Sequence, residues 1–120
     1  MVNGLFRYDP SMHVLMPVLG DDIRAQTGDQ QFVASAPLDL IFVANLDGVE
    51  GGSRVEHEFY AALDTGYISQ SIYLFCAAEG FGTVARASFD RIALGKAMKL
   101  GRFQRPILAQ SVGYAGRIRA

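Results

Sequence analysis

Two arginines near the C-terminus, Arg117 and Arg119, are separated by a single isoleucine. In an extended segment, side chains two positions apart lie on the same side, so both guanidinium groups can bind one phosphate. The alternative is an ordinary solvated terminus whose charges bind nothing. The pair is therefore a candidate phosphate site that the sequence alone leaves open.

Histidine and cysteine offer little for catalysis or metal binding. Neither His13 nor His57 has a second ligand at metal-binding spacing, and His57 falls in a region expected to be a solvated helix face. Cys76 is the only cysteine, so it can form neither an internal disulfide nor a CxxC pair. No G-x-S-x-G motif or Ser-His-Asp set is visible. We predict no metal site and assign no catalytic side chain.

A glycine pattern, Gly80-x-Gly82-x-x-Ala85, matches part of the dinucleotide-binding fingerprint. That fingerprint requires a strand before it, whereas a helix is expected here. We interpret the glycines as a helix C-cap followed by a tight turn.

The charges are divided unequally along the chain. Residues 1–85 carry three cations against eleven carboxylates, a net charge of −8, and residues 86–120 carry eight cations against one carboxylate, a net charge of +7. Such a division indicates either a basic surface for phosphate, nucleotide or nucleic acid, or attraction between the two halves within a fold or a dimer. Nucleic acid is the weaker prediction, because the aromatic residues of the basic part are few and core-like.

The elements that must position these residues begin with one long helix. Ser53-Arg54-Val55-Glu56 is a capping box, and no proline interrupts the chain before Gly80. A helix over 54–79 would be about 39 Å long. Its second half is apolar all round and is predicted to be a buried spine. Ala62, Gly66 and Ser69 form a small-residue stripe suited to close helix packing.

Strands are expected before and after this helix. The run over 38–44 is apolar and is predicted to be a central strand covered on both faces. Ser88 is expected to cap a helix over 89–100. Residues 21–31 are expected to form a short helix. The further strand candidates are 4–10, 13–19, 83–87 and 106–114. The pattern predicts a single α+β domain over 1–120, with a mainly antiparallel sheet packed against a long central helix.

The chain is 120 residues long, enough for one hydrophobic core. No apolar run approaches the roughly 20 residues of a membrane span, and the first ten residues lack the pattern of a signal peptide. We predict a cytoplasmic protein without a membrane segment.

Taken in order, several segments resemble the FMN-dependent nitroreductase family, especially its azoline-oxidising, SagB-type dehydrogenase branch. The matching segments are Gly4–Pro10 with His13, Ala36–Val43, Asp64–Ser71, Leu74–Thr83, Phe89–Asp90, the strand from Pro106, and Val112–Tyr114. The resemblance covers almost the whole chain, and it depends on the order and spacing of these segments.

The resemblance implies an α+β fold in which FMN lies at a homodimer interface and carries hydride between NAD(P)H and a small organic substrate. It places backbone N–H groups of the segment Ala85-Arg86-Ala87-Ser88 at the N5 edge of the flavin, and Arg117 and Arg119 at the FMN phosphate. A cation near N1 favours the anionic reduced ring, which makes Arg86 a further candidate.

The sequence also departs from the family. The N-terminal helical segment, which carries part of the phosphate site and of the dimer interface, has no counterpart before Gly4, and Ala87 and Ser88 replace the usual acidic residue and glycine. Three hypotheses therefore remain: a partner chain completes the site, FMN binds weakly, or the chain is a non-enzymatic binding protein on the same fold.

Overall fold

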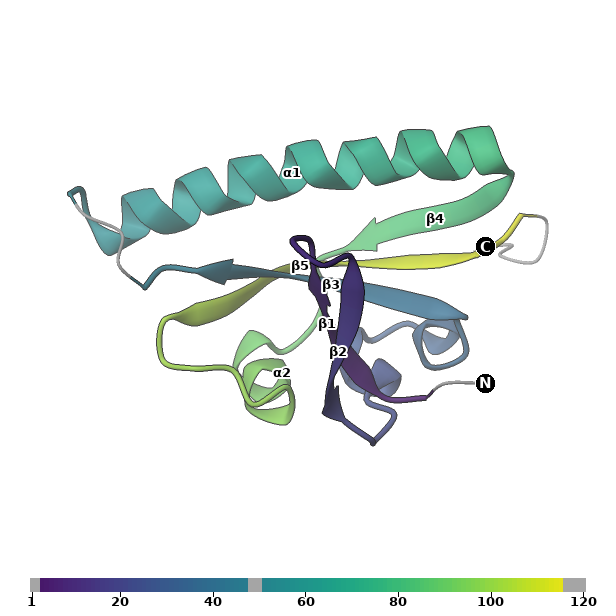
Figure 1. Cartoon of the computed structure of the whole chain (residues 1–120), viewed down its shortest axis with the longest axis horizontal. Coiled ribbons are helices and arrows are strands. Elements are labelled where there is room, and N and C mark those ends of the chain that lie inside the picture. Colours follow the sequence, from purple (N-terminus) through teal and green to yellow (C-terminus); the bar gives the residue numbers. More distant parts are fainter. Residues whose placement is uncertain (1–2, 48–50, 116–120) are drawn as a thin grey trace.

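The computed structural model describes residues 3–47 and 51–115, which form a small sheet flanked by helices (Figure 1). In chain order the elements are β1 (Leu5–Asp9), β2 (Val14–Leu19), the 3-10 helices η1 (Arg24–Thr27) and η2 (Gln31–Ala34), β3 (Leu38–Asn45), α1 (Arg54–Glu79), β4 (Phe81–Arg86), α2 (Arg91–Ala97) and β5 (Gln104–Tyr114). The predicted α+β class, the antiparallel sheet and the long helix are confirmed.

The main sheet has the order β3-β5-β4, and both pairings are antiparallel. The prediction that β3 is a central strand is therefore wrong, because β3 lies at an edge. The central strand is β5, whose residues 109–111 are fully buried, whereas most of β3 is only half-buried. An apolar run signals partial burial, but the strand order depends on pairing with a segment 59 to 74 residues away.

Helix α1 begins and ends where the local signals place it. Ser53 and Glu56 form the reciprocal capping box, and Gly80 adopts a left-handed conformation (φ 79°) with its N–H donating to the Cys76 carbonyl. One side of the helix lies on β4 and β5. There Ser69 Oγ donates to Gln110 Oε1 at 2.7 Å. A polar bond thus joins the middle of the helix to the central strand.

The second half of α1 is not a buried spine, and that prediction is wrong for the single chain. Leu74 and Phe75 are 63% and 59% exposed. The physical reason is that a three-stranded sheet covers only one side of the helix, leaving the other side open. A Cβ added at Gly66 would also meet open space, so the predicted small-residue stripe packs only at Ser69. Within the described ranges, no helix is both long and apolar enough to cross a membrane.

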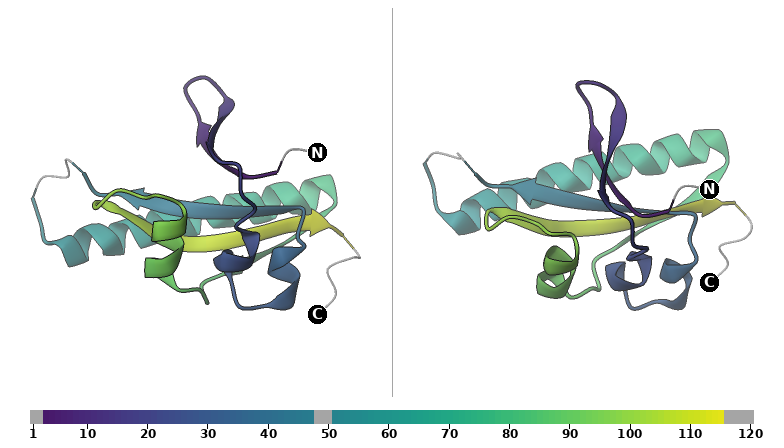
Figure 2. Two further views of the ribbon diagram at one scale, coloured as in Figure 1. Left: turned by 90° about the horizontal axis from the view of Figure 1, so that it is seen from below. Right: turned by 60° about the horizontal axis from the view of Figure 1, so that its bottom comes forward.

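The other face of the sheet is covered by α2 and the two 3-10 helices (Figure 2). The core here consists of Phe89, Leu94, Met98 and Ala109. The predicted helix over 21–31 is replaced by η1 and η2. The predicted helix over 89–100 is shorter, because Asp90 rather than Ser88 caps it and the chain leaves helical geometry after residue 97.

The first two strands form a separate hairpin that projects from the rest of the molecule (Figure 2). Most of its residues are exposed. At its turn, Tyr8 Oη and His13 Nδ1 are 2.7 Å apart. Both predicted strands are confirmed, but most of their residues lie at the surface and few contribute to the core.

Candidate functional site

The segment predicted to contact a cofactor lies at the end of β4. Ala85 and Arg86 are the last two residues of this edge strand, and Ala87 and Ser88 follow it as exposed residues without regular structure. Arg117 and Arg119 lie outside the described residues. The structure therefore gives the geometry of one half of the predicted site.

Backbone donors at the end of β4 divide into bound and free groups. The N–H of Ala85 donates to Tyr73 Oη at 2.7 Å, so this donor is already used by α1. Within the described chain, the N–H groups of Ala87 and Ser88 have no hydrogen-bond partner. Both residues are exposed. The segment thus presents two consecutive backbone donors to whatever lies beside it.

Arg86 is 5% exposed, and its side chain is bonded to buried groups of the protein. Its Nε donates to Ser111 Oγ at 2.9 Å, and its Nη2 donates to Asp39 Oδ1 at 3.1 Å. It also donates to the carbonyl and hydroxyl oxygens of Thr27. The guanidinium is therefore held inside the protein, where its positive charge is offset by one carboxylate.

Burial dominates the electrostatics of this pair. Desolvation raises the pKa of Asp39, and hydrogen bonds from Ser111 and the charge of Arg86 oppose that shift only in part. Desolvation also lowers the pKa of Arg86. Among the described residues, Asp39 Oδ2 is buried without a hydrogen-bond partner. Burying the pair is thus costly, and the hydrogen bond between the two side chains holds them in contact.

The network joins four segments that are far apart in the sequence. Thr27 ends η1, Asp39 lies in β3, Arg86 ends β4, and Ser111 lies in β5. A Cβ on Gly28 would collide with Arg86 Nη1, so glycine allows the turn after η1 to approach the guanidinium. The network therefore fixes the end of β4, from which the free donors project.

An exposed hydrogen bond of Ser88 restrains the same segment. Ser88 Oγ donates to Asp29 Oδ2 at 2.6 Å, which ties the residue after Ala87 to the loop between the two 3-10 helices. Ala87 is thus flanked by two side chains that are each bonded to the same region. This arrangement restricts the backbone without using its N–H groups.

The sequence reasoning missed Thr27, Asp39 and Ser111. One signal was present: Asp39 is the only charged residue in the strand sequence LDLIFVAN, and a carboxylate within an apolar strand requires a buried partner. Nothing local identified that partner as Arg86. Across residues 3–47 and 51–115, no group of three or more His, Cys, Asp or Glu side chains is placed to hold a metal ion.

The sequence and the fold match one family of proteins. Residues 5–114 match the Nitroreductase family, and the chain belongs to that family.

Several relatives share the fold. The chain is similar to a protein of Ralstonia eutropha JMP134 assigned as a nitroreductase, with 40% identity and a TM-score of 0.85 over 94% of this chain and 54% of that one. It is 25% identical to an assigned nitroreductase of Methanocaldococcus jannaschii over 92% of this chain and 57% of that protein. The E. coli microcin synthetase McbBCD complex contains a similar fold, with 20% identity and a TM-score of 0.78 over 92% of this chain and 44% of that one. The chain thus spans about half the length of these relatives.

Proposed function

We propose that this chain contributes the flavin-binding domain of an FMN-dependent oxidoreductase that uses NAD(P)H to reduce, or FMN to oxidise, a small organic substrate. FMN, when bound, supplies hydride transfer between the nicotinamide and the substrate. The observation that carries the proposal is the exposed pair of free N–H groups at Ala87 and Ser88, held at the end of β4 by buried bonds. The proposed placement at the N5 edge of the ring follows from the family resemblance.

The residues present fit such a group. A flat heterocycle with acceptor nitrogens needs donors that are fixed, exposed and unused, and Ala87 and Ser88 meet all three conditions. Arg117 and Arg119 are proposed to bind the phosphate. The buried bonds of Arg86 favour a positioning role for its side chain over direct contact with the ring.

A homodimer is part of the proposal and is supported by the outer side of α1. With 100° per residue, the side opposite the buried stripe carries four exposed apolar residues. These are Tyr60, Leu63, Tyr67 and Leu74. An apolar row of this kind marks an interaction surface. The occupant proposed is a second copy, with a different subunit as the alternative.

A visible absorption spectrum tests the flavin proposal. The purified protein is mixed with FMN, desalted and measured, and we expect retained flavin together with an FMN-dependent rise in Tm. Colourless protein with an unchanged Tm would contradict flavin binding by this chain. Light scattering on the same sample tests the dimer: a monomer both with and without FMN would contradict it.

The cellular location, the domain organisation and the branch of the family are also proposals. We propose a cytoplasmic protein made of a single domain, and we propose the azoline-oxidising branch of the family on the segment resemblance. The non-enzymatic alternative is not favoured by family membership. Oxidation of NADH or NADPH by the FMN-loaded protein, measured as the loss of absorbance at 340 nm, would distinguish an enzyme from a non-enzymatic binding protein.

A further inference from the structure

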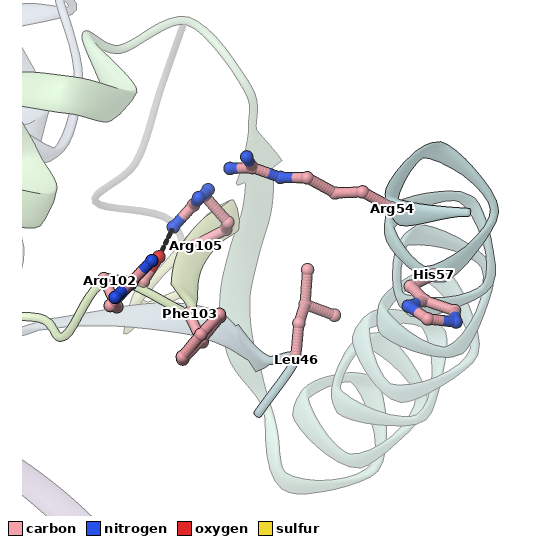
Figure 3. A pocket seen from close by; sticks show the side chains of 6 residues that line it. All are labelled: Leu46, Arg54, His57, Arg102, Phe103 and Arg105. Carbon is pink, nitrogen blue, oxygen red and sulfur yellow. Dashed lines mark hydrogen bonds between the residues drawn. The ribbon is translucent and has the colours of Figure 1, made fainter. Parts of the chain in front are cut away.

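A pocket of about 320 Å³ lies where α1 begins and β5 begins, and neither Ala87 nor Ser88 lines it (Figure 3). Its walls come from the residue after β3, the first turn of α1 and the segment that leads into β5. The lining residues are Leu46, Arg54, His57, Arg102, Phe103 and Arg105.

Positive charge exceeds negative charge in this pocket. Arg54 and Arg105 share one carboxylate, because Glu58 Oε1 lies 3.3 Å from Arg54 Nε and 4.0 Å from Arg105 Nε. Arg102, the third arginine, forms no ion pair within the described part of the chain. Like charges gathered in one hollow repel each other, and an anion relieves that repulsion.

The position of Arg54 is also unusual for a helix. It is the first residue of α1, where the helix dipole is positive and a cation is unfavourable. Glu56 in the same turn is used by the capping box. An arginine at this position therefore adds to a positive potential that the helix end already creates, and both favour the same kind of ligand.

The floor of the pocket is apolar. Leu46 and Phe103 lie beneath the arginines, and the guanidinium of Arg102 is 4.9 Å from the centre of the Phe103 ring. In Figure 3, the Arg54 side chain extends from α1 across to the side of the pocket where Arg105 and Arg102 lie. A bare inorganic ion would leave the floor uncovered, whereas an organic anion would cover it.

We propose that this pocket binds a small organic anion, with its phosphate or carboxylate group on Arg54, Arg102 and Arg105 and its apolar part against Phe103 and Leu46. The site shares no residue with the proposed flavin site, so the two proposals are independent.

Isothermal titration calorimetry at low salt tests the proposal with phenyl phosphate, benzoate and inorganic phosphate. We expect one or both organic anions to bind, and comparison of the two identifies the preferred head group. Arg102→Gln should weaken that binding at least about tenfold, since charge-assisted hydrogen bonds are the strong ones. Phe103→Ala should lower the affinity for the organic anion to about that for inorganic phosphate.

Lys96→Gln is the matched control, because it removes one exposed positive charge from α2, outside the pocket. It should change the affinity less than about twofold. The proposal is overturned if the wild type binds neither organic anion, or if Lys96→Gln weakens binding as much as Arg102→Gln. Retention of FMN should be the same in the Arg102→Gln variant and the wild type, so a failure here is distinct from a failure of the flavin proposal.

Discussion

Two arginine–aspartate pairs lie near η1, and they differ in almost every physical respect. Arg86 and Asp39 are 3.1 Å apart with side chains 3% and 2% exposed. Arg24 and Asp22 are 2.7 Å apart with side chains 36% and 44% exposed. Burial raises the pKa of Asp39, whereas the hydrogen bonds from Arg24 lower the pKa of Asp22 to about 2. The same two residue types thus give opposite shifts.

The comparison shows that solvent decides what such a pair contributes. An exposed pair keeps its hydration and gains a little from attraction. A buried pair loses the hydration of both charges, and its attraction seldom exceeds that loss. We therefore interpret the buried pair as a device that fixes the end of β4, and the exposed pair as a local contact.

The largest effect is expected from Asp39→Ala. This change leaves the Arg86 guanidinium buried without a counter-charge, which should cost about 3–5 kcal/mol of unfolding free energy. Urea denaturation followed by circular dichroism measures it. A loss of less than about 1 kcal/mol in the free energy of unfolding would mean that water reaches the guanidinium and that the pair behaves as an exposed one.

Replacing both members should restore much of that loss. The double variant Asp39→Leu/Arg86→Met removes both charges and fills the space with apolar groups, so we expect it to be about 2 kcal/mol more stable than Asp39→Ala. The same denaturation experiment applies. If the double variant is no more stable than the single variant, the unpaired guanidinium of Asp39→Ala is not a buried charge and has reached solvent.

The function of the anchored segment is tested at Ala87. Proline at this position removes one free N–H at the end of an edge strand, where proline is tolerated. We expect Ala87→Pro to bind FMN about tenfold more weakly with little change in Tm. Ala87→Ser changes the same exposed side chain, keeps both N–H groups and the Ser88–Asp29 bond, and serves as the control. Equal FMN affinity in Ala87→Pro and the wild type would remove these donors from the proposed site.

The smallest effect is expected at the exposed pair. Arg24→Gln should return the pKa of Asp22 from about 2 toward its ordinary value of 3.8, as measured by NMR titration of the carboxyl carbon. Because the folded pKa is lowered, the pair stabilises the fold above about pH 4, and this contribution is lost as the pH falls toward 2. An unchanged pKa in the variant would show that the pair is open in solution.

The features that the sequence predicted are local ones. The bounds of α1 follow from its capping box and from Gly80, and both signals lie within a few residues of the helix ends they define. The sequence predicts burial of the second half of α1 because that half is apolar all round, yet burial depends on how many strands the sheet provides.

The network around Arg86 could not be predicted in the same way. Its members, Thr27, Asp39, Arg86 and Ser111, come from four segments, and they meet only because the strand order is β3-β5-β4. The sequence indicated that Asp39 needs a partner but not which residue supplies it. The arginine pocket was missed for the same reason, since Arg54 and Arg105 are separated by most of α1, β4 and α2.

The place of β5 at the centre of the sheet also governs how the molecule can be assembled during translation. Strands β3 and β4 leave the ribosome before β5, and each pairs only with β5 in the main sheet. Until residues 104–114 have been made, both carry open edges, and pairing β3 with β5 then closes a long loop. We expect folding of the main sheet to wait for β5 and to be slow, because every pairing in this sheet is non-local or depends on β5.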